Sequence, residues 1–312
     1  MLKYKLKKDP ISDFSFSYLV DYLKAVGIEQ TDSFISQPRP EDQEDYRNLD
    51  NIMEAIKILK KGFDEDKSFF LQVDSDADGY TSAAIFYGFF RRLYPNADIE
   101  YRVHEEKEHG VVLDTVPITA DYIIIPDAGS NQFEEQLALS QQGRKVIIMD
   151  HHIYTPGEKI PNVTIINNQS SPNFKNKNLS GAGVVYKVIQ AFNQYYKDEF
   201  PIIYEDFADI AAIGIVADMM DTRDLDNNYI IYKGLNNLQN PMIRAILEKR
   251  EYSVSSVEKP NKIDVAFYIA PLINGVVRYG STEEKELLFH GLCHYEKNQV
   301  YESEFRGEVR KE

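Results

Sequence analysis

Short apolar runs and amphipathic segments alternate along the first part of the chain. Apolar runs with the length of a β-strand occupy residues 68–73, 99–103, 122–126, 145–149 and 163–166. Apolar positions at helical spacing predict helices over residues 16–25, 51–63, 81–93 and 131–142. This alternation is typical of an α/β fold with a doubly wound, mainly parallel sheet and flanking helices.

After Ser180 the pattern becomes mainly helical. The spacing predicts helices over residues 182–196, 204–217, 227–239, 241–250 and 282–291, and a polar loop over 252–263. We therefore expect a helical C-terminal part beside the sheet. Ser180 precedes Gly181 at the start of the first of these helices and has the character of an N-cap, so this N-terminus could face an anion.

Acidic residues stand at the ends of several apolar runs. They are Asp74, Asp76 and Asp78 after the first run, Asp127 and Asp150 after two later runs, and Asp218 after the helical run 210–217. His151 and His152 follow Asp150 directly. In an open parallel sheet the C-terminal ends of the strands build the binding site, so these side chains should meet there. Neighbouring carboxylates repel one another, and carboxylates together with imidazole suit Mn²⁺ or Mg²⁺ better than a structural zinc.

Each motif also has an ordinary structural interpretation. The first three acids could form a solvated turn, Asp127 could be a helix N-cap, and the acid before the two histidines could cap a loop. An EF-hand is excluded, because the twelfth loop position counted from Asp74 is Ile85 and not Glu. Asp218 favours the metal interpretation, because a carboxylate at the C-terminus of a nearly uncharged helix is unfavourable to the helix dipole unless a cation offsets it.

Other polar residues show no such pattern. His104 and His109 have no potential ligand partner at a recognisable spacing in the sequence. We interpret them as surface residues that could contact substrate. The acids at 221, 224 and 226 are interpreted as solvated or local structural groups.

Composition and charge narrow the class of protein. The chain has 312 residues, 43% apolar and 27% charged, as expected of a soluble globular protein. Its apolar runs are shorter than the ~20 residues of a membrane helix, and the basic start lacks an apolar segment, so a cytoplasmic protein without a membrane partner is expected. A single cysteine excludes a disulfide framework and a cysteine-ligated zinc. The net charge of −15 argues against generic duplex binding, although bound cations would offset several acids.

The clustered ligands predict a hydrolytic reaction. They suffice for two divalent metals about 3.5–4 Å apart, which clamp a phosphate and generate hydroxide. The chain lacks a Gly-x-x-x-x-Gly-Lys-Ser/Thr loop, and no Gly-x-Gly-x-x-Gly follows the first strand. A P-loop NTPase and a dinucleotide-dependent enzyme are therefore disfavoured, and metal-assisted hydrolysis of a phosphoester is the expected reaction.

Taken together, the motifs resemble those of the DHH phosphoesterase superfamily, and within it the RecJ-like single-strand exonucleases. The resemblance rests on Asp74-Ser-Asp-Ala-Asp78-Gly79, Pro126-Asp127-Ala-Gly129, Asp150-His151-His152 and Gly214-Ile-Val-Ala-Asp218, in this order. Segments 179–186, 226–234 and 269–274 also look RecJ-like, and the likeness covers roughly residues 17–292. The chain departs from the family at Gln72-Val73, where His-Gly is common, and at Leu272 and Val277, where Arg and Gly are more usual.

The resemblance implies roles for individual residues. It assigns metal binding to Asp74, Asp76, Asp78, Asp127, Asp150, His151 and Asp218, without deciding which of the first three are direct ligands. It assigns catalytic roles to Asp150, His151 and His152. Candidates for binding the substrate phosphate are Arg278, Asn274, Ser180 and Gly181. The implied activity is Mn²⁺- or Mg²⁺-dependent 5′-to-3′ degradation of single-stranded DNA.

The resemblance also predicts the domain organisation and leaves alternatives open. We expect a helical N-terminal region at 1–66 packed on the core, a DHH catalytic domain at 67–250, and a C-terminal segment at 251–312 with the start of a linking helix. The family's second, DHH-associated domain is expected to be absent. The alternatives to an exonuclease are a DHH phosphodiesterase for short oligonucleotides or cyclic dinucleotides, and a non-catalytic scaffold among replication or repair proteins.

Overall fold

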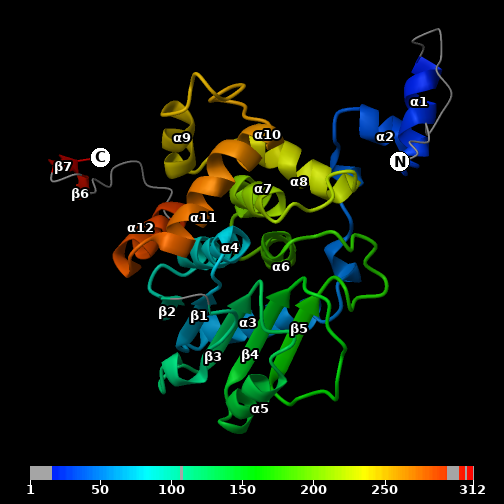
Figure 1. The fold of residues 1–312 in the computed structure, drawn as a ribbon. Helices are drawn as coiled ribbons and strands as arrows, with labels where there is room; N and C mark the ends of the chain where they lie inside the picture. The colour runs from blue at the N-terminus through cyan, green and yellow to red at the C-terminus, as the bar shows by residue number, and fades with distance from the viewer. Residues whose placement is uncertain (1–15, 106–107, 294–301, 306–307, 312) are drawn as a thin grey trace, which may run out of the picture.

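A five-stranded parallel sheet lies at the centre of the fold (Figure 1). The computed structural model describes residues 16–105, 108–293, 302–305 and 308–311. The strands are β1 (Phe69–Val73), β2 (Ile99–Val103), β3 (Tyr122–Pro126), β4 (Lys145–Asp150) and β5 (Val163–Asn167). Their order is β2-β1-β3-β4-β5, and every pair is parallel. The predicted strands and the predicted fold class are confirmed.

The register of the sheet places the strand ends side by side. Pro126 at the end of β3 pairs with Met149, and Asp150 at the end of β4 pairs with Asn167 at the end of β5. Asp127 therefore follows β3 at the edge of the sheet where β4 delivers Asp150. This common edge is where a parallel sheet gathers its functional groups.

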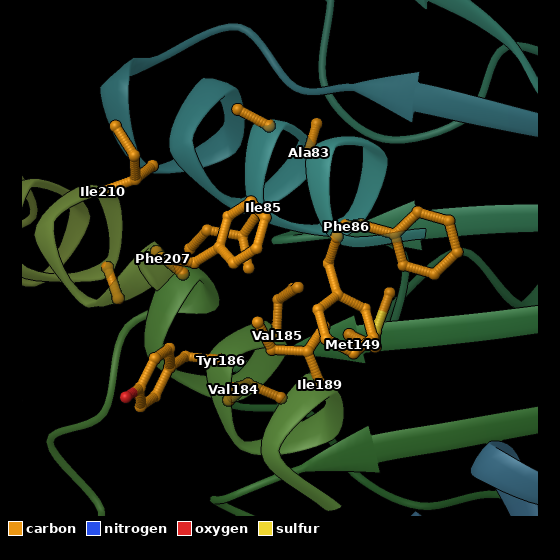
Figure 2. Close-up of a cluster of buried hydrophobic side chains, with 14 of the residues drawn as sticks. Ala83, Ile85, Phe86, Met149, Val184, Val185, Tyr186, Ile189, Phe207 and Ile210 are labelled. Atoms are coloured by element: carbon orange, nitrogen blue, oxygen red, sulfur yellow. The ribbon is translucent and has the colours of Figure 1, made fainter. Parts of the chain in front are cut away.

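Alternate side chains along the strands pack into two separate apolar cores. One core contains Leu71, Ile124 and Ile147 together with side chains of α3 (Ile52–Asp64), α4 (Ala77–Leu93) and α6 (Gly181–Tyr195). Figure 2 shows part of it, with Phe86 of α4 and Ile189 of α6 beside Met149 of β4. The other core contains Ile123, Ile125 and Ile148 with Leu139 of α5 (Phe133–Gln141). Helices thus cover both faces, as a doubly wound sheet requires.

The C-terminal part is helical and packs beyond α4 and α6. It consists of α7 (Ala208–Ala217), α8 (Leu225–Leu235), α9 (Pro241–Glu248), α10 (Lys262–Asp264), α11 (Ala270–Tyr279) and α12 (Thr282–Cys293). A π-helical turn, Val265–Ile269, joins α10 to α11. Figure 1 shows the strand tips pointing towards the layer formed by α4, α6 and α7. A short antiparallel hairpin of β6 (Glu302–Phe305) and β7 (Glu308–Lys311) follows.

The N-terminal segment contains α1 (Phe16–Ala25) and α2 (Thr31–Ile35) before α3. Ile56 and Leu59 of α3 are fully buried in the first core, so this helix is an integral part of the sheet's cover. Residues 1–15, which include the basic start of the chain, lie outside the described residues.

One sequence prediction needs correction: the helix predicted from about residue 81 begins at Ala77, so Asp78 lies in its first turn. Of the acids interpreted as solvated or local structural groups, Asp226 is structural. It is buried and forms an ion pair of 2.5 Å with Lys187, whose side chain is also buried. This pair joins α8 to α6. Within the described part of the chain, no helix is long and apolar enough to span a membrane.

Candidate metal centre

Asp78 is held by the N-terminus of α6. Its Oδ2 accepts a hydrogen bond of 2.7 Å from the Gly181 amide, and its Oδ1 accepts one of 3.1 Å from the Ala182 amide. Ser180 caps the helix as predicted, because its Oγ accepts from the amide of Gly183. The helix N-terminus does face an anion, and that anion is the protein's own carboxylate.

This arrangement gives Ser180 and Gly181 a structural role beside the phosphate-binding role predicted for them. Both residues are buried, and the Gly181 amide already donates to Asp78. A Cβ on Gly181 would lie 2.2 Å from Oδ1 of Asp127, so only glycine allows the helix to approach both carboxylates. Gly181 therefore shapes the site, and its amide is already bound to the protein's own carboxylate.

Three carboxylates converge on one ring nitrogen. Nε2 of His151 lies 3.2 Å from Oδ1 of Asp127, 3.5 Å from Oδ2 of Asp218 and 3.9 Å from Oδ2 of Asp78. These residues come from the first turn of α4, the end of β3, the loop after β4 and the C-cap of α7. Segments from distant parts of the sequence thus bring Asp78, Asp127, His151 and Asp218 together, as the sequence predicted.

The carboxylates around His151 disfavour one another's ionisation. Burial raises the pKa of Asp127 well above its usual value, and the Asp78 charge raises it further. Burial, with Asp78 and Asp76 nearby, raises the pKa of Asp218 to about 7. Among the described residues, Oδ1 of Asp127 and Oδ2 of Asp218 are buried without a hydrogen-bond partner. Buried acceptors without partners are costly, and a divalent cation among three carboxylates and an imidazole would satisfy them.

Asp150 has a different environment from the converging acids. Its Oδ1 accepts from the His151 amide at 2.7 Å, the His152 amide at 3.1 Å and the His152 Nδ1 at 2.8 Å, while Oδ2 accepts from the Ser130 amide at 3.0 Å. Burial alone would raise its pKa, but these hydrogen bonds and the His152 charge hold the pKa at about 2. In turn, Asp150 raises the pKa of His152 to about 9. The carboxylate thus orients the two histidines through its hydrogen bonds.

The acids of the first motif divide in the same way. Asp76 is the N-cap of α4 and accepts from the amide of Gly79 at 2.9 Å. Asp74 accepts from the Gly110 amide and from Nδ1 of His109, each at 2.7 Å. Burial works against ionisation of Asp74, but hydrogen bonds from His104 and His109 lower its pKa to about 2. Only Asp78 of this motif joins the residues around His151.

Of the two histidines in the loop after β2, His104 departs from the surface interpretation. It is buried, with Nδ1 3.0 Å from Oε2 of Glu108 and Nε2 3.7 Å from Oδ1 of Asp74. His109 is exposed, as interpreted, but its ring is bound to Asp74, and this contact raises its pKa. The sequence contained a usable signal, because residues 104–110 directly follow a strand of the parallel sheet and so reach the same edge as the acids.

The predicted phosphate-binding residues of α11 lie beside the first motif. Oδ1 of Asn274 accepts a hydrogen bond of 3.0 Å from the amide of Ala77 at the start of α4. Arg278 is exposed and four residues further along the same helix, hence on the same face. Asn274 therefore has a structural contact, while Arg278 presents its charge to solvent from that side of the site.

Comparisons with known proteins agree with this geometry. Residues 69–215 match the model of the DHH family, N-terminal domain. These residues therefore resemble a DHH family N-terminal domain. The relatives that the chain is similar to are RecJ-like proteins, as the motif order predicted.

Two relatives and one solved structure illustrate the similarity. The chain is 36% identical over 313 residues to the "Putative SPbeta prophage-derived single-strand DNA-specific exonuclease YorK" of Bacillus subtilis, covering 99% of this chain and 52% of that protein. It is 30% identical to the single-stranded-DNA-specific exonuclease RecJ of Thermus thermophilus, covering 76% of this chain and 34% of that protein. The crystal structure of the Thermus thermophilus RecJ with Mn²⁺ superposes with a TM-score of 0.63 and 27% identity, over 79% of this chain and 35% of that one. The chain thus spans about half the length of the first relative and about a third of the others.

Proposed function

We propose that this chain carries the catalytic domain of a Mn²⁺- or Mg²⁺-dependent exonuclease that degrades single-stranded DNA from the 5′ end. The observation that carries the proposal is the cluster around Nε2 of His151. Oδ1 of Asp127 and Oδ2 of Asp218 converge on this nitrogen, and neither oxygen has a hydrogen-bond partner in the described chain. The names of its relatives and the Mn²⁺ in a RecJ structure support the same activity.

The proposed ligand set follows from which side chains lie around Nε2 of His151. Asp78, Asp127, His151 and Asp218 would hold a metal, and Asp127, His151 and His152 form an adjoining group of possible ligands. At this site the four residues would hold a metal whose chemistry, when bound, would be to polarise a phosphoryl oxygen and to lower the pKa of a bound water for phosphodiester hydrolysis. Asp74, Asp76 and Asp150 would support this set through the contacts described above, not through direct ligation.

The remaining residues would bind and orient the substrate. Nδ1 of His152 contacts Asp150, so Nε2 lies on the outer side of the ring. The side chain of His152 is 44% exposed. His152 can therefore donate a hydrogen bond to the scissile phosphate at the mouth of the buried cluster. The exposed guanidinium of Arg278 would contact a neighbouring phosphate of the strand, since its planar group matches phosphate oxygens.

A single assay tests this function. Mn²⁺-dependent hydrolysis of a 5′-labelled single-stranded oligonucleotide is measured beside hydrolysis of a dinucleotide, for wild type and Asp127→Asn. Successive release of mononucleotides from the 5′ end of the long substrate, lost in Asp127→Asn, is the expected result. Cleavage of the dinucleotide alone would assign the protein to the phosphodiesterases of short oligonucleotides. Bound Mn²⁺ without hydrolysis of either substrate would favour a non-catalytic role.

A further inference from the structure

A second histidine–carboxylate pair lies beside the DHH histidines. Nδ1 of His109 is 2.7 Å from Oδ2 of Asp74, and Nδ1 of His152 is 2.8 Å from Oδ1 of Asp150. The two rings lie edge to face, with centroids 5.4 Å apart and an interplanar angle of 79°. His152 in turn lies 4.4 Å from the ring of His151, which is the focus of the metal ligands. The two pairs therefore flank the same opening.

The loop that carries His109 is anchored at several points. The Gly110 amide donates to Oδ1 of Asp74, and Ser75 Oγ donates to the carbonyl of Glu108 at 2.5 Å. Gly110 has a φ of +71°, a conformation that glycine adopts without the penalty of a side chain. Lys285 of α12 donates to the carbonyls of residues 104 and 105. The His109 ring is thus placed by backbone contacts on both of its sides, unlike a surface histidine on a free loop.

The surroundings of His109 indicate a role towards substrate, not towards metal. Its side chain is 57% exposed, against 10% for His151, so the ring lies at the rim of the cluster. Its Nδ1 is engaged by Asp74, and both oxygens of Asp74 have protein donors. The remaining ring nitrogen of His109, Nε2, is therefore the one available to an incoming group.

We propose that His109 is a second phosphate-binding residue of this centre, which contacts the scissile phosphodiester from the side opposite His152, and that Asp74 is its positioning residue. This inference rests on the proposed hydrolysis of phosphodiesters. The rings are close enough for oxygens of one phosphate group to accept hydrogen bonds from both, at about 2.8 Å each. Two imidazoles held by carboxylates would bind the phosphate above the buried ligands and orient it for attack.

The test compares His109→Gln, Asp74→Asn and the double variant with wild type. His290→Gln serves as a matched control, because His290 lies on α12 and hydrogen-bonds Tyr101. Three quantities are measured: kcat/KM on single-stranded DNA with Mn²⁺, the Kd for Mn²⁺, and the Kd for a non-hydrolysable phosphorothioate strand in Ca²⁺. Loss of a hydrogen bond to a charged group predicts that His109→Gln lowers kcat/KM and strand affinity about 10- to 100-fold. Its Mn²⁺ affinity and that of His290→Gln should equal the wild-type value.

The variants of the pair should not be additive, because they remove one unit. Asp74→Asn should match His109→Gln, and the double variant should lose nothing more. An unchanged strand affinity in His109→Gln overturns the proposal. A loss of Mn²⁺ affinity in His109→Gln as large as in Asp127→Asn also overturns it, because the ring would then serve the metal. If wild type hydrolyses no DNA, the proposed function fails, while the strand-affinity measurement still decides the role of His109.

Discussion

Oδ1 of Asp127 lies 3.2 Å from Nε2 of His151, and neither the ring nor any other described group donates a hydrogen bond to that oxygen. Two possible metal-ligand atoms, on residues that directly follow neighbouring strands, thus lie close together in a buried place. Proteins rarely leave such atoms without partners, and the arrangement is stable when a cation lies between them. The predictions below follow from this pair and from the packing that holds it.

Asp127→Asn should separate metal binding from folding. The substitution removes a buried charge next to Asp78, so the metal-free variant should be at least as stable as metal-free wild type. Wild type should gain about 2.7 kcal/mol when Mn²⁺ is present at a hundred times its Kd, whereas the variant should gain almost nothing. Thermal unfolding with Mn²⁺ and with EDTA measures both effects. An equal Mn²⁺-induced rise in Tm for the two proteins would contradict the assigned ligand.

Gly181→Ala should damage the metal centre from the side of α6. The new Cβ would lie 2.2 Å from Oδ1 of Asp127, which forces the carboxylate or the helix to move. Such overpacking costs roughly 1–3 kcal/mol, and Mn²⁺ affinity should fall with it. Gly275→Ala is the control, because a Cβ on that helical glycine meets no atom within 4 Å. Mn²⁺ titration of both variants should show a loss for position 181 alone.

Arg278→Ala should weaken substrate binding without slowing the chemical step. The guanidinium is exposed on α11, apart from the ligands around His151. A contact made equally in the ground state and the transition state changes KM and leaves kcat unchanged. Steady-state kinetics on single-stranded DNA at several salt concentrations gives KM and kcat separately. Arg278→Lys should recover part of the affinity. A fall in kcat at unchanged KM would place the residue at the reacting phosphate instead.

The buried pair of Lys187 and Asp226 should be required for folding stability. Lys187→Met leaves the carboxylate of Asp226 buried without its cation, and breaking such a pair costs about 3–5 kcal/mol. Lys187→Met with Asp226→Leu should recover much of the loss, because neither charge then remains in the core. Urea unfolding of the three proteins gives the free energies. Similar losses in the single and double variants would show that packing, and not charge, dominates at this position.

Because of Asp209, the free energy of unfolding should fall as pH rises. Burial raises its pKa to about 6, despite hydrogen bonds of 2.8 Å from the amides of Gln239 and Asn240. Because the folded state binds this proton more tightly than the unfolded chain, stability falls from about pH 4 to about pH 6 and is flat above that. The unfolding free energy of wild type minus that of Asp209→Asn isolates the effect. A difference that does not change across this window would contradict the raised pKa.

The fold could be predicted from the sequence because its signals are local. Each strand is an apolar run that ends at an acid or a loop, and the helices show their periodicity over several turns. The helical segment from Val265 to Tyr279 was not predicted, because Pro271 and the π-helical turn before it interrupt the regular spacing. The start of α4 was placed too late, since Asp78 and Gly79 have low helix propensity and only the cap by Asp76 compensates.

The site could be predicted only in part. The motifs named the converging residues Asp78, Asp127, His151 and Asp218, because each stands at the end of an element. The sequence could not show that the amide of Gly181 binds a carboxylate, since that contact joins residues 103 positions apart. The pairing of His109 with Asp74 was missed for the same reason, as it depends on how the loop after β2 turns.

The contact between Asp78 and the start of α6 also determines when the centre can form during synthesis. The carboxylate leaves the ribosome about a hundred residues before the amide that binds it, and Asp218 follows later still. A nascent chain that ends before α7 lacks one ligand and cannot complete the cluster. The capacity to bind metal should therefore appear late in synthesis and in one step. Mn²⁺ affinity measured on ribosome-bound chains of increasing length should rise in one step once α7 has emerged.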